Sequence, residues 1–307
     1  MSETLVAVVD ETWAGSRVDR YLSEALELCN RSQLKSRSVE VRVNGEHARL
    51  SRKLSEGDRV EATLEPLELP SLEPEAIELP ILFENEEVIV INKPQGLVVH
   101  PGAGNPSGTL ANALLHHSLE LRSAFPGDSA LRPGIVHRLD KETSGVIVAA
   151  KNPAALDALA RRFRARETEK QYIAILRGEL PASRGRVDGF IRRDPTNRKR
   201  FVYSPTVGKE AETSYRVLRR LPGGYTLVRF EPKSGRTHQL RVHAVQLHAP
   251  ILGDPIYSRR DNRFPDASLM LHAFSLRITL PGEDEPRRFR APLPGRFKEV
   301  VRSLTAG

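Results

Sequence analysis

Residues 131–151 read LRPGIVHRLDKETSGVIVAAK, a polar turn that leads directly into an apolar run. The run, residues 146–150, is rich in β-branched side chains and carries no charge, which is typical of a strand buried on both faces. His137, Arg138 and Asp140 precede it, so a carboxylate lies on a turn that the buried strand holds in place. Catalytic groups are often carried by loops that a rigid scaffold positions. From these residues alone, Asp140 beside Arg138 is equally consistent with a structural ion pair, which is the commoner arrangement.

The composition indicates a globular chain that is long for a single domain. Of its 307 residues, 39% are hydrophobic and 28% are charged, which is ordinary for a water-soluble protein. A single hydrophobic core stops growing at about 250–300 residues, so we expect two domains. No apolar run approaches the roughly 20 residues that span a bilayer, and residues 1–13 lack the basic and apolar regions of a secretory signal. We therefore expect a cytoplasmic protein without a membrane partner.

The charge distribution favours a polyanionic partner. The formal net charge is +8 and the isoelectric point is about 9.8. Residues 61–87 contain nine glutamates and neither lysine nor arginine, so the rest of the chain is more basic than the total suggests. A basic body interrupted by an acidic segment is more easily reconciled with a nucleic acid than with a membrane or a small substrate.

A first domain is predicted over residues 15–63. Apolar side chains in residues 18–26 are spaced for one face of a helix, and residues 39–43 alternate apolar and polar as a half-buried strand does. The Asn-Gly pair at residues 44–45 is typical of a tight hairpin turn. Residues 59–62 predict a further strand, which makes a small unit of helices and sheet.

Basic side chains in residues 31–37, RSQLKSR, suit a short helix that contacts phosphate groups. Arg31, Lys35 and Arg37 are the candidates, because contacts to phosphates dominate affinity for nucleic acid. This segment alone favours a solvated basic face over a phosphate contact. Residues 64–80, LEPLELPSLEPEAIELP, follow the domain and predict an extended acidic linker, since four prolines prevent a helix or a central strand.

A second domain is predicted over residues 81–303. Residues 88–92 read as a buried strand, and Lys93-Pro94 after them as a fixed turn beneath the polar turn at Asp140. Further segments alternate helical and extended patterns: we expect helices over residues 109–119 and 152–166, and strands over residues 169–176, 209–215 and 225–230.

Four segments together resemble a known enzyme family. HRLDKETSG (137–145) closely resembles the active-site motif of the RluA family of pseudouridine synthases. ENEEVIVINKPQGLVVHPG (84–102), EKQYIAIL (169–176) and GRTHQLRVH (235–243) resemble further motifs of that family in the same order. The resemblance implies an α+β catalytic domain with a long mixed and antiparallel sheet. It also implies isomerisation of uridine to pseudouridine in RNA, with large-subunit ribosomal RNA or its precursor as the expected partner.

The resemblance assigns roles to single residues. Asp140 corresponds to the catalytic nucleophile, Tyr172 to a tyrosine that lies against the target base, and Arg236 to the arginine that pairs with the nucleophile. An adjacent guanidinium favours the ionised form of a carboxylate, which a nucleophile requires.

Contacts to the RNA are implied as well. The target base must leave the RNA stack to enter the pocket. Arg138 is placed to fill the vacated stack or to grip the flipped nucleotide, beside His137, and Leu240 is placed to border the uracil pocket.

The first domain resembles the S-four RNA-binding domain. The resemblance is carried by RVDRYLSE (17–24), RSQLKS (31–36), VRVNGE (41–46) and LSEGD (54–58). It implies a small α/β domain that assigns Arg31, Lys35 and Arg37 to the RNA surface. We expect the whole protein to act as a monomer.

No metal or cofactor is expected. Cys29 is the only cysteine, and the stretch of His238, Gln239, Arg241 and His243 contains no carboxylate and no HExxH helix, so a zinc site is improbable. Detaching, rotating and rejoining a uracil needs neither a redox step nor a nucleotide cofactor.

Two alternatives remain open from the sequence. One is a catalytically inactive RNA-binding or ribosome-assembly factor on the same fold, against which the intact set of Asp140, Tyr172 and Arg236 speaks. The other is a carboxylate-dependent nucleosidase or glycosidase. Such an enzyme normally needs a second, paired carboxylate, and the matched motifs offer none.

Overall fold

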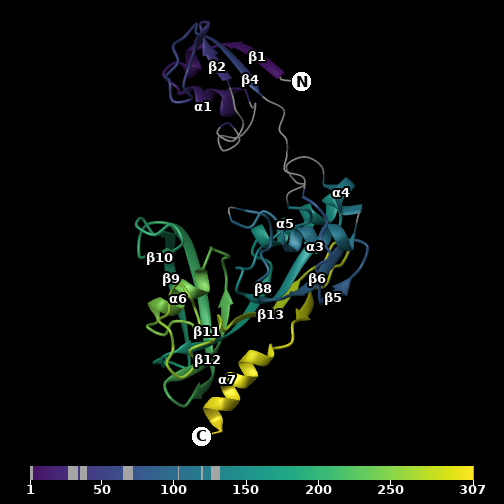
Figure 1. Cartoon of the computed structure of the whole chain (residues 1–307), viewed down its shortest axis with the longest axis vertical. Coiled ribbons are helices and arrows are strands. Elements are labelled where there is room, and N and C mark those ends of the chain that lie inside the picture. Colours follow the sequence, from purple (N-terminus) through teal and green to yellow (C-terminus); the bar gives the residue numbers. More distant parts are fainter. Residues whose placement is uncertain are drawn as a thin grey trace. The chain divides into compact units, whose positions relative to one another are not determined.

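The computed structural model of the chain describes residues 3–26, 34, 40–64, 72–102, 104–118, 120–125 and 132–306. The chain divides into two compact units, Met1–Pro70 and Ser71–Gly307 (Figure 1). Of the helix predicted over residues 31–37 only Leu34 is described, and Arg31, Lys35 and Arg37 lie outside the described residues. None of the described helices is both long enough and apolar enough to cross a membrane.

The first unit is built on a small antiparallel sheet. Its strand order is β1-β4-β2-β3. The elements are β1 (Glu3–Val8), the 3₁₀ turn η1 (Glu11–Trp13), α1 (Val18–Arg20), which continues into the π-helical turn η2 (Tyr21–Ala25), β2 (Glu40–Val43), β3 (Glu46–His47) and β4 (Arg59–Leu64).

The core of the first unit joins the helical segment to the sheet. Val18 and Leu22 are fully buried, in the same hydrophobic cluster as Val43 of β2. Asn44 and Gly45 both have positive φ angles, 56° and 83°, as an Asn-Gly hairpin turn requires. Strand β1 was not predicted, because the expected domain starts at residue 15. β1 pairs along its whole length with β4.

The second unit contains one long sheet. Among the described residues, ten strands form it in the order β10-β9-β11-β12-β8-β13-β7-β6-β5, with β14 paired to β13. Strands β7 and β13 run parallel and the other pairs antiparallel, so the predicted α+β fold with a long mixed sheet is confirmed.

The strands and helices of the second unit follow the chain in this order: β5 (Ile81–Glu84), β6 (Val88–Lys93), α3 (Leu110–His117), α4 (Glu120–Ala124), β7 (Ser144–Ala150), α5 (Pro153–Arg164), β8 (Glu169–Arg177), β9 (Arg184–Arg193), β10 (Phe201–Ser204), β11 (Lys209–Leu221), β12 (Tyr225–Pro232), α6 (Gln239–Gln246), β13 (Leu271–Ile278), β14 (Arg287–Arg290) and α7 (Gly295–Thr305). Figure 1 shows the sheet with α3 and α5 near β6 and α6 near β9.

Strand β7 is the most deeply buried strand of the unit. All seven of its residues are buried, as the apolar run predicted. At its start Gly145 has a φ angle of 118°, and a Cβ atom there would collide with the backbone oxygen of Ala273 in β13. Glycine is therefore required where the two parallel strands approach each other.

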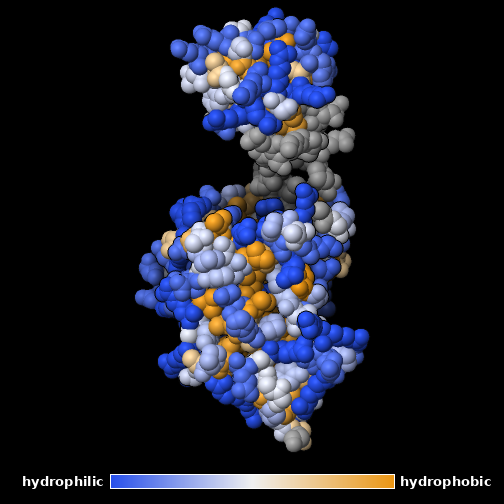
Figure 2. All heavy atoms as spheres, turned by 90° about the vertical axis from the view of Figure 1, so that its left-hand side faces the viewer, coloured by the Kyte–Doolittle hydropathy of each residue, from blue (hydrophilic) through white to orange (hydrophobic). Residues whose placement is uncertain are grey.

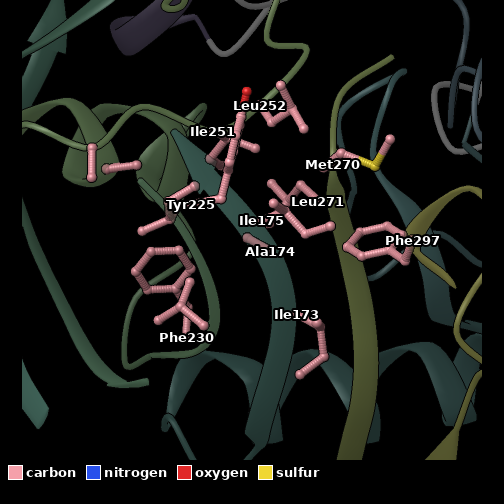
Figure 3. Close-up of a cluster of buried hydrophobic side chains, with 14 of the residues drawn as sticks. Ile173, Ala174, Ile175, Tyr225, Phe230, Ile251, Leu252, Met270, Leu271 and Phe297 are labelled. Atoms are coloured by element: carbon pink, nitrogen blue, oxygen red, sulfur yellow. The ribbon is translucent and has the colours of Figure 1, made fainter. Parts of the chain in front are cut away.

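A large hydrophobic cluster holds β8, β13 and the last helix together. Figure 3 shows Ile175 of β8 next to Leu271 of β13, with Phe297 of α7 nearby and Ile173 farther along β8. These side chains are at most 7% exposed. On the face shown in Figure 2, apolar residues gather in the middle of the second unit and hydrophilic residues surround them.

The predicted acidic linker is in part a packed segment. Leu72 is buried, and Ile77 and Leu79 pack against the cluster that contains α3. The backbone N–H of Glu75 donates to the carbonyl of Asn112 (3.1 Å), whose side-chain amide donates to the carbonyl of Glu73 (2.8 Å). The second unit therefore begins before the predicted boundary at residue 81, because the apolar side chains between the prolines pack against its hydrophobic core.

Candidate active site

The turn that carries Asp140 leads directly into β7. The backbone N–H of Thr143 donates to the carbonyl of Asp140 (3.0 Å), which closes the turn. The side chain of Asp140 is 20% exposed. The carboxylate is thus held by the scaffold and still reaches a cavity.

A buried lysine supports this turn from below. Lys93, at the end of β6, is fully buried, and its ammonium donates to the carbonyls of Pro94 (2.8 Å), Leu97 (2.8 Å) and Lys141 (3.2 Å). Burial lowers the pKa of Lys93 to about 7. The interpretation of Lys93-Pro94 as a fixed turn beneath Asp140 agrees with these contacts.

The charged partner of Asp140 is Arg241. Its Nη1 atom lies 3.3 Å from Oδ2 of Asp140. The same guanidinium forms two hydrogen bonds of 2.7 Å to the carboxylate of Asp254, which is fully buried. Burial alone lowers the pKa of Arg241, but the hydrogen bonds and charge of Asp254, with the charge of Asp140, outweigh it and raise that pKa. Arg241 is therefore a permanently charged group fixed beside Asp140.

The predicted pair of Asp140 and Arg236 is corrected by this geometry. The Nε atom of Arg236 donates to the backbone oxygen of Glu210 (2.9 Å) instead. Arg236 precedes α6, in a loop where its own backbone N–H donates to the side-chain oxygen of Gln239 (2.9 Å). Arg241 lies in the first turns of the helix, which directs it towards Asp140. Arg236 still lines the pocket.

His238 was singled out in the sequence only for a zinc site, and it lies next to the carboxylate. Its Nε2 atom is 3.9 Å from Oδ2 of Asp140, and its Nδ1 atom is 2.9 Å from the hydroxyl of Tyr257. Burial lowers the pKa of His238; the charge of Asp140 opposes that shift and the charge of Arg241 adds to it. His238 has a positive φ angle of 56°, which a residue other than glycine rarely adopts and which often marks a functional site.

A small pocket of about 90 Å³ opens in front of Asp140. It is lined by five of the residues predicted from the sequence: Arg138, Asp140, Tyr172, Arg236 and Leu240. Tyr172 comes from β8 and Leu240 from α6, so the pocket lies between the sheet and that helix. Burial, and the negative charge of Asp140, raise the pKa of Tyr172. The tyrosine is therefore neutral near pH 7.

His137 and Arg138 are placed differently from each other. The ring of His137 stacks on Phe163 of α5 at 4.5 Å, and its Nε2 atom accepts the backbone N–H of Val148 in β7 (3.0 Å). Burial, with the charge of Lys170, lowers the pKa of His137 to about 3. His137 is thus neutral and joins α5 to β7, whereas Arg138 is exposed at the rim of the pocket.

The arrangement suits nucleophilic chemistry by a carboxylate. Asp140 faces a small pocket, a fixed guanidinium lies beside its carboxylate, and an aromatic ring borders the space in front of it. Among the described residues, no group of three or more histidine, cysteine, aspartate or glutamate side chains is placed to hold a metal ion.

Comparisons with known proteins identify related chains. Residues 87–246 match the family model described as RNA pseudouridylate synthase. The chain is 42% identical to "Ribosomal large subunit pseudouridine synthase D" of Borreliella burgdorferi, over 92% of this chain and 87% of that protein. It is 39% identical to the protein of the same name from Pasteurella multocida, over 99% of this chain and 95% of that protein.

A solved structure extends the likeness to the fold. The structure titled "Human RNA Pseudouridylate Synthase Domain Containing 1" superposes with a TM-score of 0.57 at 28% identity. The match covers 76% of this chain and 97% of that chain.

Proposed function

We propose that this protein, which belongs to the RNA pseudouridylate synthase family, isomerises uridine in large-subunit ribosomal RNA with Asp140 as its nucleophile. The family match and the identity to curated relatives over most of the chain show the membership, and with it an enzyme that forms pseudouridine in RNA. The ribosomal substrate is proposed because the two relatives carry that substrate in their names.

The ion pair of Asp140 and Arg241 is the observation that carries the proposal. Asp140 attacks the ribose or the uracil of the target nucleotide, and its charged form is the reactive one. The bond between C1′ of the ribose and N1 of the uracil breaks, the base rotates, and C5 forms the new bond to C1′. The bond to Asp140 breaks again, C5 loses its proton and N1 takes one up, so that the product is an isomer of the substrate. Arg241 holds the carboxylate in position, and Asp254 keeps Arg241 in place. A catalytically inactive RNA-binding factor, the alternative, would not need a carboxylate held in this position by Arg241.

Tyr172 and Leu240 hold the uracil in the pocket. Both line the space in front of Asp140, and stacking on an aromatic ring is a common way to hold a flipped base. Arg138 at the rim fills the place that the base leaves in the RNA stack. Flipping costs a few kcal/mol, which contacts of this kind offset.

The first unit supplies additional RNA affinity as an S-four-like domain, for which its sequence motifs and the basic charge of the chain are the support. Arg31, Lys35 and Arg37 are its proposed phosphate contacts. We also propose that the protein works in the cytoplasm, where a modifier of ribosomal RNA meets its substrate. Because one chain carries the residues of the site, we propose that it acts as a monomer.

A strain lacking the gene tests the function. Pseudouridines are mapped across its ribosomal and transfer RNA, after rescue with the wild type or with Asp140→Asn. We expect at least one site in large-subunit ribosomal RNA to disappear in the deletion strain, to return with the wild type and to stay absent with Asp140→Asn. An unchanged map would contradict the proposal and favour RNA binding without chemistry.

A further inference from the structure

A second hollow, of about 430 Å³, adjoins the catalytic pocket. The two share five lining residues: Arg138, Tyr172, Pro232, Ser234 and Gly235. The second hollow extends from these towards α5, where Ala160, Phe163 and Arg164 line it. A strand of RNA whose flipped uridine occupies the pocket therefore has a neighbouring space for the next part of its backbone.

The lining of this hollow is cationic. It contains Arg138, Arg164 and Lys170, and no carboxylate. Within the part of the chain that the structure describes, none of these three side chains forms an ion pair or a hydrogen bond. Three unpaired cations around one hollow favour an anionic ligand.

The nearby carboxylates already have other partners. Glu169, next to Lys170, binds Arg277 and Arg288 at 2.6 Å each. Glu167, on the chain segment that follows α5, binds Arg162 at 2.7 Å. The positive charge of Arg164 and Lys170 is therefore left for a ligand.

Lys170 is directed into the same space as Tyr172. The two residues are two positions apart in β8, so their side chains leave the same face of the sheet. Lys170 is half-buried, and burial, with the charge of Arg166, lowers its pKa. A bound anion would offset both effects.

One side of the hollow is aromatic. The stacked rings of His137 and Phe163 form part of its lining and tie α5 to β7. Arg164, the last residue of α5, is exposed and lines the same hollow.

We propose that this hollow is a phosphate subsite: Lys170 and Arg164 bind the phosphodiester of the nucleotide adjacent to the flipped uridine. The inference rests on the proposed function, because the catalytic pocket defines where the uridine lies. The subsite means that recognition of the RNA backbone next to the target uridine depends on Lys170 and Arg164 of the catalytic unit.

Salt-dependent binding tests the charge contact. The probe is a uridine-only oligoribonucleotide, and the variants are Lys170→Met and Arg164→Gln. Each variant should weaken binding about tenfold at low salt. Each should also reduce the slope of log affinity against log salt by about 0.7, the loss of one phosphate contact on a single strand.

Matched controls separate this effect from net charge. Lys298→Met removes one lysine from the exposed side of α7, and Arg161→Gln removes one arginine from α5, outside the lining. Both controls should keep a slope within about 0.3 of the wild type, less than half of one phosphate contact. Lys170→Arg should keep the full slope as well. Thermal unfolding of all variants shows whether they fold.

Uncharged linkages locate the subsite. The probe is a short stem-loop of large-subunit ribosomal RNA with the uridine that the deletion strain identifies, made with one methylphosphonate linkage at each position in turn. For the wild type, the linkage on one side of the target uridine should weaken binding about tenfold. Folded Lys170→Met, which keeps Arg164, should be less sensitive to that same linkage, and the double variant Lys170→Met with Arg164→Gln should be insensitive to it.

Each outcome decides between the two claims. If folded Lys170→Met and Arg164→Gln keep the wild-type slope on the uridine-only probe, the subsite is refuted. If wild-type protein makes no pseudouridine in ribosomal RNA, the proposed function fails, while the salt slopes still decide whether the two cations bind a phosphate.

Discussion

Nη1 of Arg241 lies 3.3 Å from Oδ2 of Asp140, while the other edge of the same guanidinium forms two 2.7 Å hydrogen bonds to the buried Asp254. One arginine therefore connects the proposed nucleophile to a buried anchor in the fold. Because Arg241 is only 4% exposed, water screens this connection weakly. The orientation of Asp140 depends on it.

Arg241→Lys should lower the rate of pseudouridine formation about 10²- to 10³-fold at saturating RNA. A lysine keeps the charge but lacks the planar fork that binds Asp254 through two nitrogens and reaches Asp140 with a third. Single-turnover assays on ribosomal RNA from the deletion strain measure the effect. Arg236→Lys is the matched control and should lose less than about tenfold, because Arg236 bonds a backbone oxygen and not Asp140. A larger loss for Arg236→Lys would contradict the assignment.

Lys93 should make the free energy of unfolding depend on pH. Burial lowers its pKa to about 7 in the folded protein, whereas an unfolded lysine titrates at about 10.4. Between about pH 7 and pH 10.4 the unfolded state binds more protons than the folded state, so the free energy of unfolding should rise with pH across this window. This gain in stability is lost as the pH falls through about 7. Relative to Lys93→Met, the wild type should gain up to about 1.4 kcal/mol per pH unit in that window. Urea unfolding of both proteins at several pH values measures this, and a constant difference would refute it.

Gly145→Ala should destabilise the second unit by several kcal/mol. The new Cβ would collide with the backbone of Ala273, and the φ angle of 118° is unfavourable for alanine. Gly224→Ala is the control, since it also has a positive φ angle but nothing within 4 Å of the added atom. The control should cost only about 1–2 kcal/mol. Equal losses in chemical unfolding would mean that β7 and β13 tolerate the added atom.

Tyr172→Phe should retain the pH dependence of the reaction near neutrality. The raised pKa of Tyr172 means that its hydroxyl is protonated there, so removing it changes no charge. Tyr172→Ala removes the ring itself and should lower kcat/KM about 10- to 100-fold, since stacking on a base is worth about 1–3 kcal/mol. Rates between about pH 6 and pH 9 compare the variants. A new pH-dependent step in Tyr172→Phe would show that the hydroxyl moves a proton.

Local patterns were sufficient for the strands beside the site. Residues 88–91 and 146–150 are uninterrupted apolar runs, and both lie in buried strands. The Asn-Gly pair at residues 44–45 forms its expected turn because the backbone preference is a property of the two residues themselves. The motif around Asp140 likewise placed the carboxylate at the entry of a buried strand.

The long-range arrangement of the site was not accessible in the same way. Arg236 and Arg241 lie five positions apart in one motif, and only the start of α6 at Gln239 decides which of them faces Asp140. His238 reaches the carboxylate because its backbone is left-handed, which no pattern of side chains indicates. The sequence of residues 72–80 predicts a free linker, because it does not show that Leu72 is buried against residues far along the chain.

The most direct measurement combines RNA binding and pseudouridine formation for purified wild type and Asp140→Asn on ribosomal RNA from the deletion strain. Asn keeps the size of the side chain and removes the charge that Arg241 faces. We predict that Asp140→Asn binds this RNA within about threefold of the wild type, a difference below 1 kcal/mol, and forms no pseudouridine. Pseudouridine formation by Asp140→Asn at a rate near that of the wild type would contradict Asp140 as the nucleophile.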